Sequence, residues 1–319
     1  MADGHSLWRP APSAVYLPAM GRRTNPRIQK LKGSLVVAGL RLLGLLPFRL
    51  NRALATAVGR LLAALPSEAR RVTRINLSLC LPNQPNPDQL VRDSLVETVK
   101  NTFEIALFWR RPEEGLDRVV SVDGDGPLRE AVDAGQPVLI LAPHIGCWEV
   151  LNFWLARDFP LHVMFAPSGM AEVDDLIKRG REHFGSTMYP ASARGVAGLV
   201  RAMRKGAMTA ILPDQVADRR SGRFAPFFGQ PAYTGTLSCK LVQQTGARVF
   251  MAWARRLPGA GGFEIRVRPA HQDIHDSDLD HALKAMNQSI EALILEEPSQ
   301  YLWSYKRFRR QPPGGTLPY

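Results

Sequence analysis

The chain has 319 residues, and its 41 lysines and arginines against 29 aspartates and glutamates give a formal net charge of +12. This length and an ordinary globular composition exclude an intrinsically disordered protein and a small disulfide-stabilised domain. The excess positive charge favours polyanionic partners, which include nucleic acid, anionic lipid headgroups and acidic carrier proteins, but does not choose among them.

The three cysteines, Cys80, Cys147 and Cys239, form no C-x-x-C pair and predict no disulfide framework. A reducing compartment is therefore expected. The first 20 residues lack the basic start and apolar run of a secretory signal.

Residues 1–30 are rich in Pro, Gly and Arg and predict a flexible N-terminus. The next stretch, 31–50, is the most apolar of the chain. The 16 residues between Lys32 and Arg49 would make a helix of roughly 24 Å, which is short of the ~30 Å hydrocarbon core of a bilayer. Arg41 near its middle adds a further cost, so a clean membrane span is not expected.

A second apolar stretch follows at 52–66, and five basic residues precede the first. Together they predict a membrane-associated helical segment over 31–66 that enters one leaflet from the cytoplasmic side and meets anionic headgroups. The alternative is a pair of core helices in a soluble protein.

Residues 67–319 are expected to form one α/β domain. Residues 67–116 have helical periodicity, and from about 119 short apolar runs alternate with helical stretches. This alternation is typical of a mostly parallel central sheet covered by helices. The helices are expected at 146–157, 171–184, 193–205, 234–245 and 277–296, and a hairpin at 247–255 and 262–269.

Three predicted strands end in the same way, in a proline followed by a polar residue: "VLILAPH" (138–144), "HVMFAPS" (162–168) and "MTAILPD" (208–214). Proline cannot donate to a sheet ladder, so each strand must stop there. Because the carboxyl ends of parallel strands share one edge of a sheet, His144, Ser168 and Asp214 should emerge on the same side. This edge is the predicted ligand site.

His144 and Glu149 can meet only at a strand-to-helix junction. Positions five apart on one helix differ by roughly 140°, so His144 must stand before the helix and Glu149 in its first turns. There the carboxylate can hold one imidazole nitrogen while the other takes a proton from a bound hydroxyl. Two alternatives remain: His144 caps the helix with Glu149 near its positive end, or Cys147 is a nucleophile with His144 as its base.

The order of motifs along the chain decides among these. The H-x-x-x-x-E after an apolar strand is followed by "LPDQ", "FAPFFGQPAYTG" and "QYLWSYKRFRRQP". From about residue 71 to 312 this order resembles the bacterial lipid A late acyltransferases, within the lysophospholipid acyltransferase superfamily. An N-terminal membrane helix also belongs to that pattern.

The resemblance implies a role for each matching residue. His144 would be the general base, paired with Glu149. Arg181, with Arg179 as its rival, and Asp214 beside Gln215 would bind substrate, and Arg181 or the N–H groups at the start of the 146–157 helix would stabilise the oxyanion. Neither a metal nor a cofactor is expected.

The implied reaction is transfer of a fatty acyl chain from an acyl carrier protein thioester to a hydroxyl of a lipid A precursor. The expected partners are acidic acyl carrier protein and lipid at the cytoplasmic face of the bacterial inner membrane. One alternative is another lipid acceptor or acyl-CoA as donor, and a second is a non-enzymatic basic protein that binds membrane or nucleic acid. The dispersed basic residues and the lack of a nucleic-acid motif count against nucleic acid.

Two further segments are assigned to this function as hypotheses. The aromatics of "FAPFFGQPAYTG" (224–235) can wall an acyl tunnel or can be ordinary core. Phosphate or carrier protein can bind basic residues that follow the Asp-Gln loop and lie near the C-terminus: Arg219, Arg220, Arg223, Lys306, Arg307, Arg309 and Arg310.

Overall fold

The computed structural model describes residues 34, 37–167 and 170–319. The predicted flexible N-terminus at 1–30 and the strand-end residue Ser168 lie outside the described residues.

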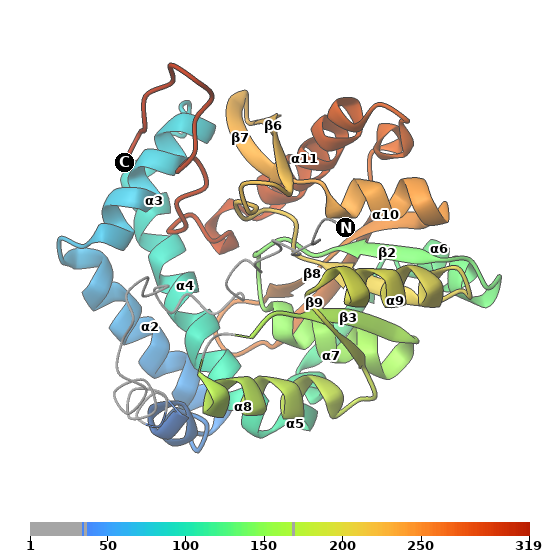
Figure 1. Ribbon diagram of the computed structural model, residues 1–319. Helices are drawn as coiled ribbons and strands as arrows, with labels where there is room; N and C mark the ends of the chain where they lie inside the picture. The colour runs from blue at the N-terminus through green and yellow to red at the C-terminus, as the bar shows by residue number, and fades with distance from the viewer. Residues whose placement is uncertain (1–33, 35–36, 168–169) are drawn as a thin grey trace.

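A seven-stranded sheet forms the centre of the molecule (Figure 1). Its strands are β1 (Val119–Asp123), β2 (Val138–Leu141), β3 (Leu161–Phe165), β4 (Thr187–Pro190), β5 (Met208–Ile211), β8 (Arg248–Arg256) and β9 (Phe263–Pro269). The spatial order is β1-β9-β8-β2-β5-β3-β4. Strands β8, β2, β5, β3 and β4 are parallel, while β9 pairs antiparallel with β8 and parallel with β1. The expected mostly parallel sheet and the β8–β9 hairpin are both confirmed.

Each face of the sheet has its own hydrophobic core. On β2, Val138 and Ile140 face one core and Leu139 and Leu141 the other, and all four are fully buried. A strand covered on both sides has this continuous apolar composition. One core includes residues of α5 (Pro112–Asp117), α6 (Gly126–Asp133), α7 (Trp148–Asp158) and α8 (Ala171–Glu182), and the other residues of α9 (Ala193–Met203), α10 (Leu237–Thr245) and α11 (Leu279–Glu296).

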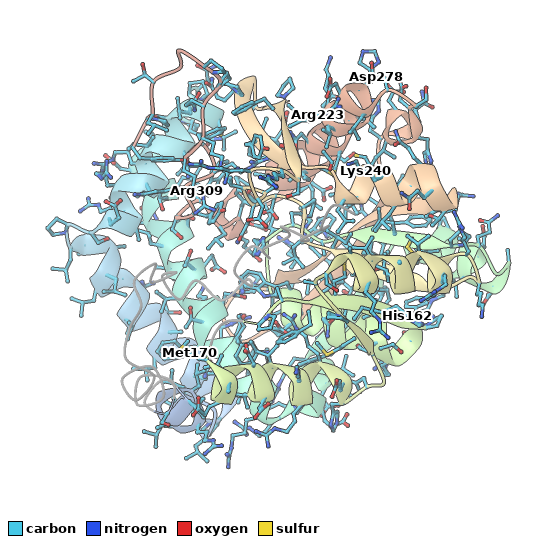
Figure 2. All side chains as sticks on the ribbon, in the orientation of Figure 1. His162, Met170, Arg223, Lys240, Asp278 and Arg309 are labelled. Carbon is cyan, nitrogen blue, oxygen red and sulfur yellow. The ribbon has the colours of Figure 1, made fainter. Side chains whose placement is uncertain are left out.

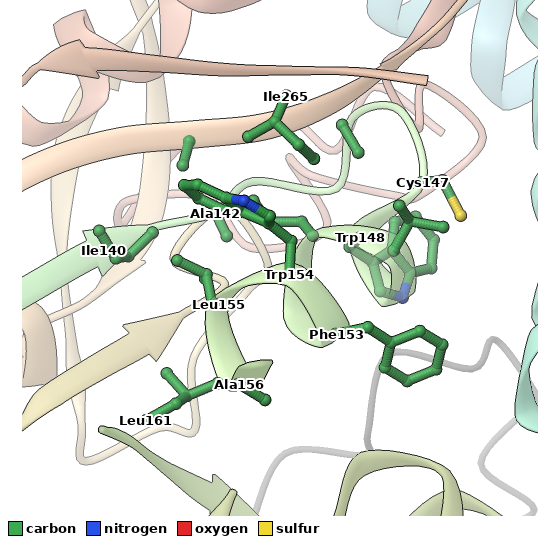
Figure 3. Packing of buried hydrophobic residues seen from close by; sticks show 14 of the residues in the cluster. Ile140, Ala142, Cys147, Trp148, Phe153, Trp154, Leu155, Ala156, Leu161 and Ile265 are labelled. Carbon is green, nitrogen blue, oxygen red and sulfur yellow. The ribbon is translucent and has the colours of Figure 1, made fainter. Parts of the chain in front are cut away.

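Helix α7 packs closely against the sheet. Trp154 and Leu155 of α7 lie beside Ile140 of β2 and Ile265 of β9 (Figure 3). Cys147 and Trp148 stand at the start of the helix in the same view. This packing fixes the direction in which α7 leaves the end of β2.

Three helices lie beside the sheet at the left of Figure 1: α2 (Phe48–Ala64), α3 (Glu68–Cys80) and α4 (Pro87–Arg110). A buried ion pair joins α2 to α4, with Arg52 Nε 2.9 Å from Glu104 Oε1. Arg256 of β8 binds the other oxygen of Glu104 at 2.6 Å, so the helical lead-in is fixed to the sheet. The helical prediction for 67–116 is confirmed.

The apolar segment 31–50 is not one helix over its described part. Residues 37–43 are helical, residues 44–46 form a turn, and α2 begins at Phe48 directly after Pro47. Proline fixes the backbone angle and is tolerated at a helix start but not in a helix interior. Among the described residues, no helix has the length and apolarity needed to cross a bilayer.

No strand was expected in the aromatic segment 224–235, and a helix was expected from 234. The segment forms an antiparallel hairpin of β6 (Gly222–Phe227) and β7 (Gln230–Gly235), and α10 begins only at Leu237 rather than at 234. Phe227 is 1% exposed and packs in the core beneath α11. Two short 3₁₀ helices, Gln272–His275 and Pro298–Gln300, complete the secondary structure of the described residues.

Candidate active site

His144 and Asp214 meet at the carboxyl end of two adjacent parallel strands, β2 and β5. The backbone N–H of His144 donates to Asp214 Oδ2 at 3.0 Å, and its Nδ1 lies 2.8 Å from Oδ1. Both side chains are almost completely buried. The prediction that strand punctuation brings His144 and Asp214 together is confirmed.

The charge of Asp214 determines how the imidazole is protonated. Burial raises the pKa of Asp214, but the charge of His144 and its hydrogen bonds outweigh burial, so the pKa lies below its usual value. The carboxylate is therefore ionised and accepts hydrogen bonds only, which places the imidazole proton on Nδ1. Nε2 is then the nitrogen with a free lone pair.

Gln215 lies against that second nitrogen, with its Nε2 3.0 Å from Nε2 of His144. The amide donates to the imidazole lone pair, as an entering hydroxyl group would. Both side chains line one cavity of about 450 Å³, which we call the His144 cavity. Its volume is in the usual range of small-molecule sites, about 300–1,000 Å³.

The His144 cavity has both polar and apolar lining. His144, Gln215 and Arg181 line it beside the apolar side chains of Met164, Phe165, Val196, Ile211, Leu212 and Leu237. Further polar side chains line it as well: Asp218, Arg220, Ser221, Thr236, Ser238 and Lys240. Such a cavity can hold a hydrocarbon chain with its reactive carbon beside the imidazole. None of Phe224, Phe227 and Phe228 lines this cavity.

Glu149 pairs with Arg181 and not with His144. It stands in the first turn of α7, as the sequence predicts, but its two oxygens accept hydrogen bonds from Arg181 Nη2 at 2.5 Å and Nε at 3.2 Å. The expected His144–Glu149 pair is therefore wrong, because Asp214 occupies Nδ1 and Gln215 faces Nε2. Residue spacing located Glu149 on the helix but did not show which neighbour its carboxylate meets.

Arg181 is the arginine of α8 that reaches the site. Its rival Arg179 is exposed and donates to the backbone oxygen of Asp175 one turn earlier. Burial lowers the pKa of the Arg181 guanidinium, but Glu149 raises it by more, so the group stays charged. A fixed cation in the cavity can stabilise a negative oxygen that forms on a substrate.

Two of the backbone N–H groups expected as alternative oxyanion donors already have partners. The N–H of Gly146 donates to Gln300 O at 3.2 Å, and that of Cys147 donates to Ala254 O at 2.9 Å. The thiol of Cys147 is fully buried, and burial together with the charge of Glu104 raises its pKa far above the usual range. A thiol that keeps its proton is inert, which argues against the cysteine-nucleophile alternative.

Sequence reasoning missed the residues that hold the loop of His144. Arg256 Nη2 donates to Gly146 O at 2.9 Å, and Leu302 N donates to His144 O at 3.0 Å. Tyr305 contributes on the Asp214 side, where its hydroxyl accepts from Val216 N at 3.0 Å. The segment "QYLWSYKRF" thus contacts both the loop of His144 and the loop that follows Asp214. Its high aromatic content was the sequence feature that could have indicated a role in the site.

Two of the predicted basic residues have structural roles. Arg307 is 3% exposed and donates to Tyr233 O and Thr234 Oγ1. Arg223 pairs with Asp280 at the surface. The guanidinium of Arg307, which is buried and hydrogen bonded, is therefore not available to bind a phosphate.

Sequence comparison identifies the family. The profile of the bacterial lipid A biosynthesis acyltransferases matches residues 22–310. The chain belongs to this family. It is an acyltransferase.

Named relatives of this acyltransferase differ in the acyl group that their names specify. The lipid A biosynthesis palmitoleoyltransferase of Escherichia coli K12 is 24% identical over 277 residues, which is 86% of this chain and 90% of the relative. The lauroyltransferase of the same organism is 23% identical over 84% of this chain and 88% of its own. The myristoyltransferase is 26% identical over 89% and 88%.

Proposed function

We propose that this acyltransferase moves a fatty acyl chain from an acyl carrier protein thioester to a hydroxyl of a lipid A precursor, with His144 as general base. The observation that carries the proposal is His144, held by Asp214 at Nδ1, in a cavity that it lines together with the cation Arg181 and several apolar side chains. A hydroxyl is a poor nucleophile until a base takes its proton, and this nitrogen is the basic one.

Five polar residues have roles in the proposed reaction. The acceptor hydroxyl displaces the amide of Gln215 from Nε2, gives its proton to the imidazole and attacks the thioester carbonyl carbon. Asp214 stabilises the imidazolium, and Arg181 stabilises the oxyanion, with Glu149 fixing its orientation. Collapse of the tetrahedral intermediate breaks the C–S bond, and the leaving thiolate takes the proton from His144.

The proposed acceptor is a lipid, and an exposed apolar surface supports the proposal that the enzyme works at the cytoplasmic face of the inner membrane. Seven leucines on α2 and around it are between 41% and 66% exposed: Leu42, Leu45, Leu50, Leu54, Leu61, Leu62 and Leu65. Exposed arginines lie among them at 41, 49 and 60. A helix with an apolar face and basic residues binds an anionic membrane surface without crossing it.

An assay with purified enzyme tests the catalytic proposal. Wild type is expected to transfer acyl groups from an acyl carrier protein thioester to a lipid A precursor, and His144→Ala to lose at least about 100-fold in kcat. Circular dichroism and thermal melting of the variant would show an intact fold. Full activity of His144→Ala would refute the assignment of the base, and transfer only from acyl-CoA would refute the donor.

Membrane contact is tested separately by pelleting with vesicles that contain anionic lipid. Leu54→Glu and Leu61→Glu are expected to release the protein from the vesicles. Val120→Glu is the matched control, because Val120 is also exposed but belongs to β1. Equal binding of all three variants would contradict a lipid-facing role of α2.

A further inference from the structure

Two long parts of the chain contain no acidic residue. Residues 183–213 include four lysines and arginines and residues 219–263 include seven, and neither range has an aspartate or glutamate. The first range contains α9 and the second contains α10, which lie next to each other on one side of the sheet (Figure 1). The basic residues of these two helices therefore have no acidic neighbour within their own stretch of sequence.

A groove runs between α9 and the C-terminal half of α10, with a volume of about 530 Å³. Its floor is formed by Val196, Ala197 and Val200, and its rim by Arg201, Arg204 and Gln244. We call it the α9–α10 groove. Arg204 Nη2 donates to Gln244 O at 3.3 Å, which holds that guanidinium at the rim.

The cations around the α9–α10 groove are not used in ion pairs within the described residues. Arg194, Arg201 and Lys205 are exposed. Within the described residues, no carboxylate oxygen lies within 4.0 Å of a side-chain nitrogen of these three. Small apolar side chains between exposed cations can accept an amphipathic helix that bears carboxylates, as charge complementarity requires.

The α9–α10 groove adjoins the His144 cavity, since Val196 lines both. Lys240 of α10 and Arg220 also line the cavity, and Figure 2 shows Lys240 on α10 above α9. A flexible arm attached to a protein in the groove would therefore have a short path past Val196 to the imidazole.

The leucine-bearing helix α2 lies on the other side of the molecule from α9 and α10 (Figure 1). A lipid acceptor and a soluble protein donor would thus approach from different sides. With α2 on the membrane, α9 and α10 would lie on the side of the molecule away from it.

We propose that the α9–α10 groove is the docking surface for the acidic acyl carrier protein, an inference that rests on the proposed function for the identity of the donor. A helix of the carrier occupies the groove with its carboxylates against Arg201 and Arg204. The thioester arm enters the His144 cavity between Val196 and Lys240.

Charge reversal at the rim tests the docking surface. In Arg201→Glu/Arg204→Glu, the KM for the acyl carrier thioester is expected to rise at least tenfold with kcat unchanged. Because the attraction is electrostatic, the wild-type KM should rise with salt and that of the variant should not. Transfer from a neutral acyl-pantetheine thioester, which has no carrier protein, should be the same in both.

Arg92→Glu is the matched control. Arg92 is exposed on α4, where its guanidinium donates to Gln89 Oε1. It lines neither the α9–α10 groove nor the His144 cavity. Its KM for the carrier thioester should match wild type. An unchanged KM in the rim variant would overturn the docking surface while the His144 assay stands, and a wild-type enzyme that ignores the carrier thioester would overturn the donor and the docking surface together.

Discussion

Asp214 and His144 are joined by two hydrogen bonds, one to the imidazole Nδ1 at 2.8 Å and one to the backbone N–H at 3.0 Å. One carboxylate thereby fixes both the ring and the loop that carries it. Neither bond alone would set the direction of Nε2, because a ring held at one atom can still turn about it.

Replacement of this carboxylate should remove catalysis more than stability. In Asp214→Asn the amide can present its NH₂ group to Nδ1, which moves the imidazole proton to Nε2 and eliminates the base. We expect kcat to fall about 10²- to 10⁴-fold. Steady-state kinetics with the acyl donor in excess measures this, and a variant that kept more than about a tenth of wild-type kcat would contradict the role of Asp214.

Arg181 and Glu149 should separate stability from activity. Arg181→Met leaves the Glu149 carboxylate buried without its partner, which costs about 3–5 kcal/mol, and should also lower kcat about 10²- to 10³-fold. The double variant Arg181→Met/Glu149→Met should regain the melting temperature but not the activity. Recovery of both would mean that the ion pair is only structural, and urea unfolding with parallel assays distinguishes the two results.

The sequence predicted those site contacts that follow from strand topology. His144 and Asp214 could be placed together because proline marks where β2 and β5 end, and neighbouring parallel strands end at one edge. The Glu149–Arg181 pair joins α7 to α8, and no local pattern encodes how two helices turn toward each other. The nearest carboxylate in sequence was therefore assigned to the imidazole, although the correct one comes from another strand.

Proline also explains two errors in the predicted elements. Pro226 and Pro231 suppress the strand signal of β6 and β7, yet they pair with each other in a two-stranded ribbon, where prolines are tolerated. Pro47 ends the apolar run that was read as one helix. Composition identified these segments as apolar, whereas their backbone geometry depends on single residues.

Acid should destabilise the enzyme through Asp214. Its pKa in the folded protein lies below the ordinary 3.8, since the interactions with His144 outweigh burial. A group with a depressed pKa contributes stability that is complete above its unfolded pKa and is lost as pH falls through the folded value. Between about pH 4.5 and pH 3, the melting temperature of wild type should therefore fall more steeply than that of Asp214→Asn, as calorimetry can measure. Equal slopes would contradict an ionised Asp214.

Gly146 should tolerate no side chain, because two constraints act on it. Its φ is +60°, and a Cβ would clash with the backbone oxygen of Ala254 on β8. Gly135 is the matched control, since its φ is +68° with no atom within 4 Å of an added Cβ. Gly135→Ala should cost only the backbone strain, about 1–2 kcal/mol, and keep full activity.

Gly146→Ala must in addition push the loop of His144 away from β8, which would break the hydrogen bond from Arg256 to Gly146 O. Urea unfolding should show a loss larger than that of Gly135→Ala. Kinetics should show a fall in kcat of about 100-fold, because a shift of about 1 Å in a catalytic group has this effect. If both alanine variants were equally active, the contact between Gly146 and Ala254 would not position the base. The orientation of the His144 imidazole would then depend on Asp214 and Leu302 alone.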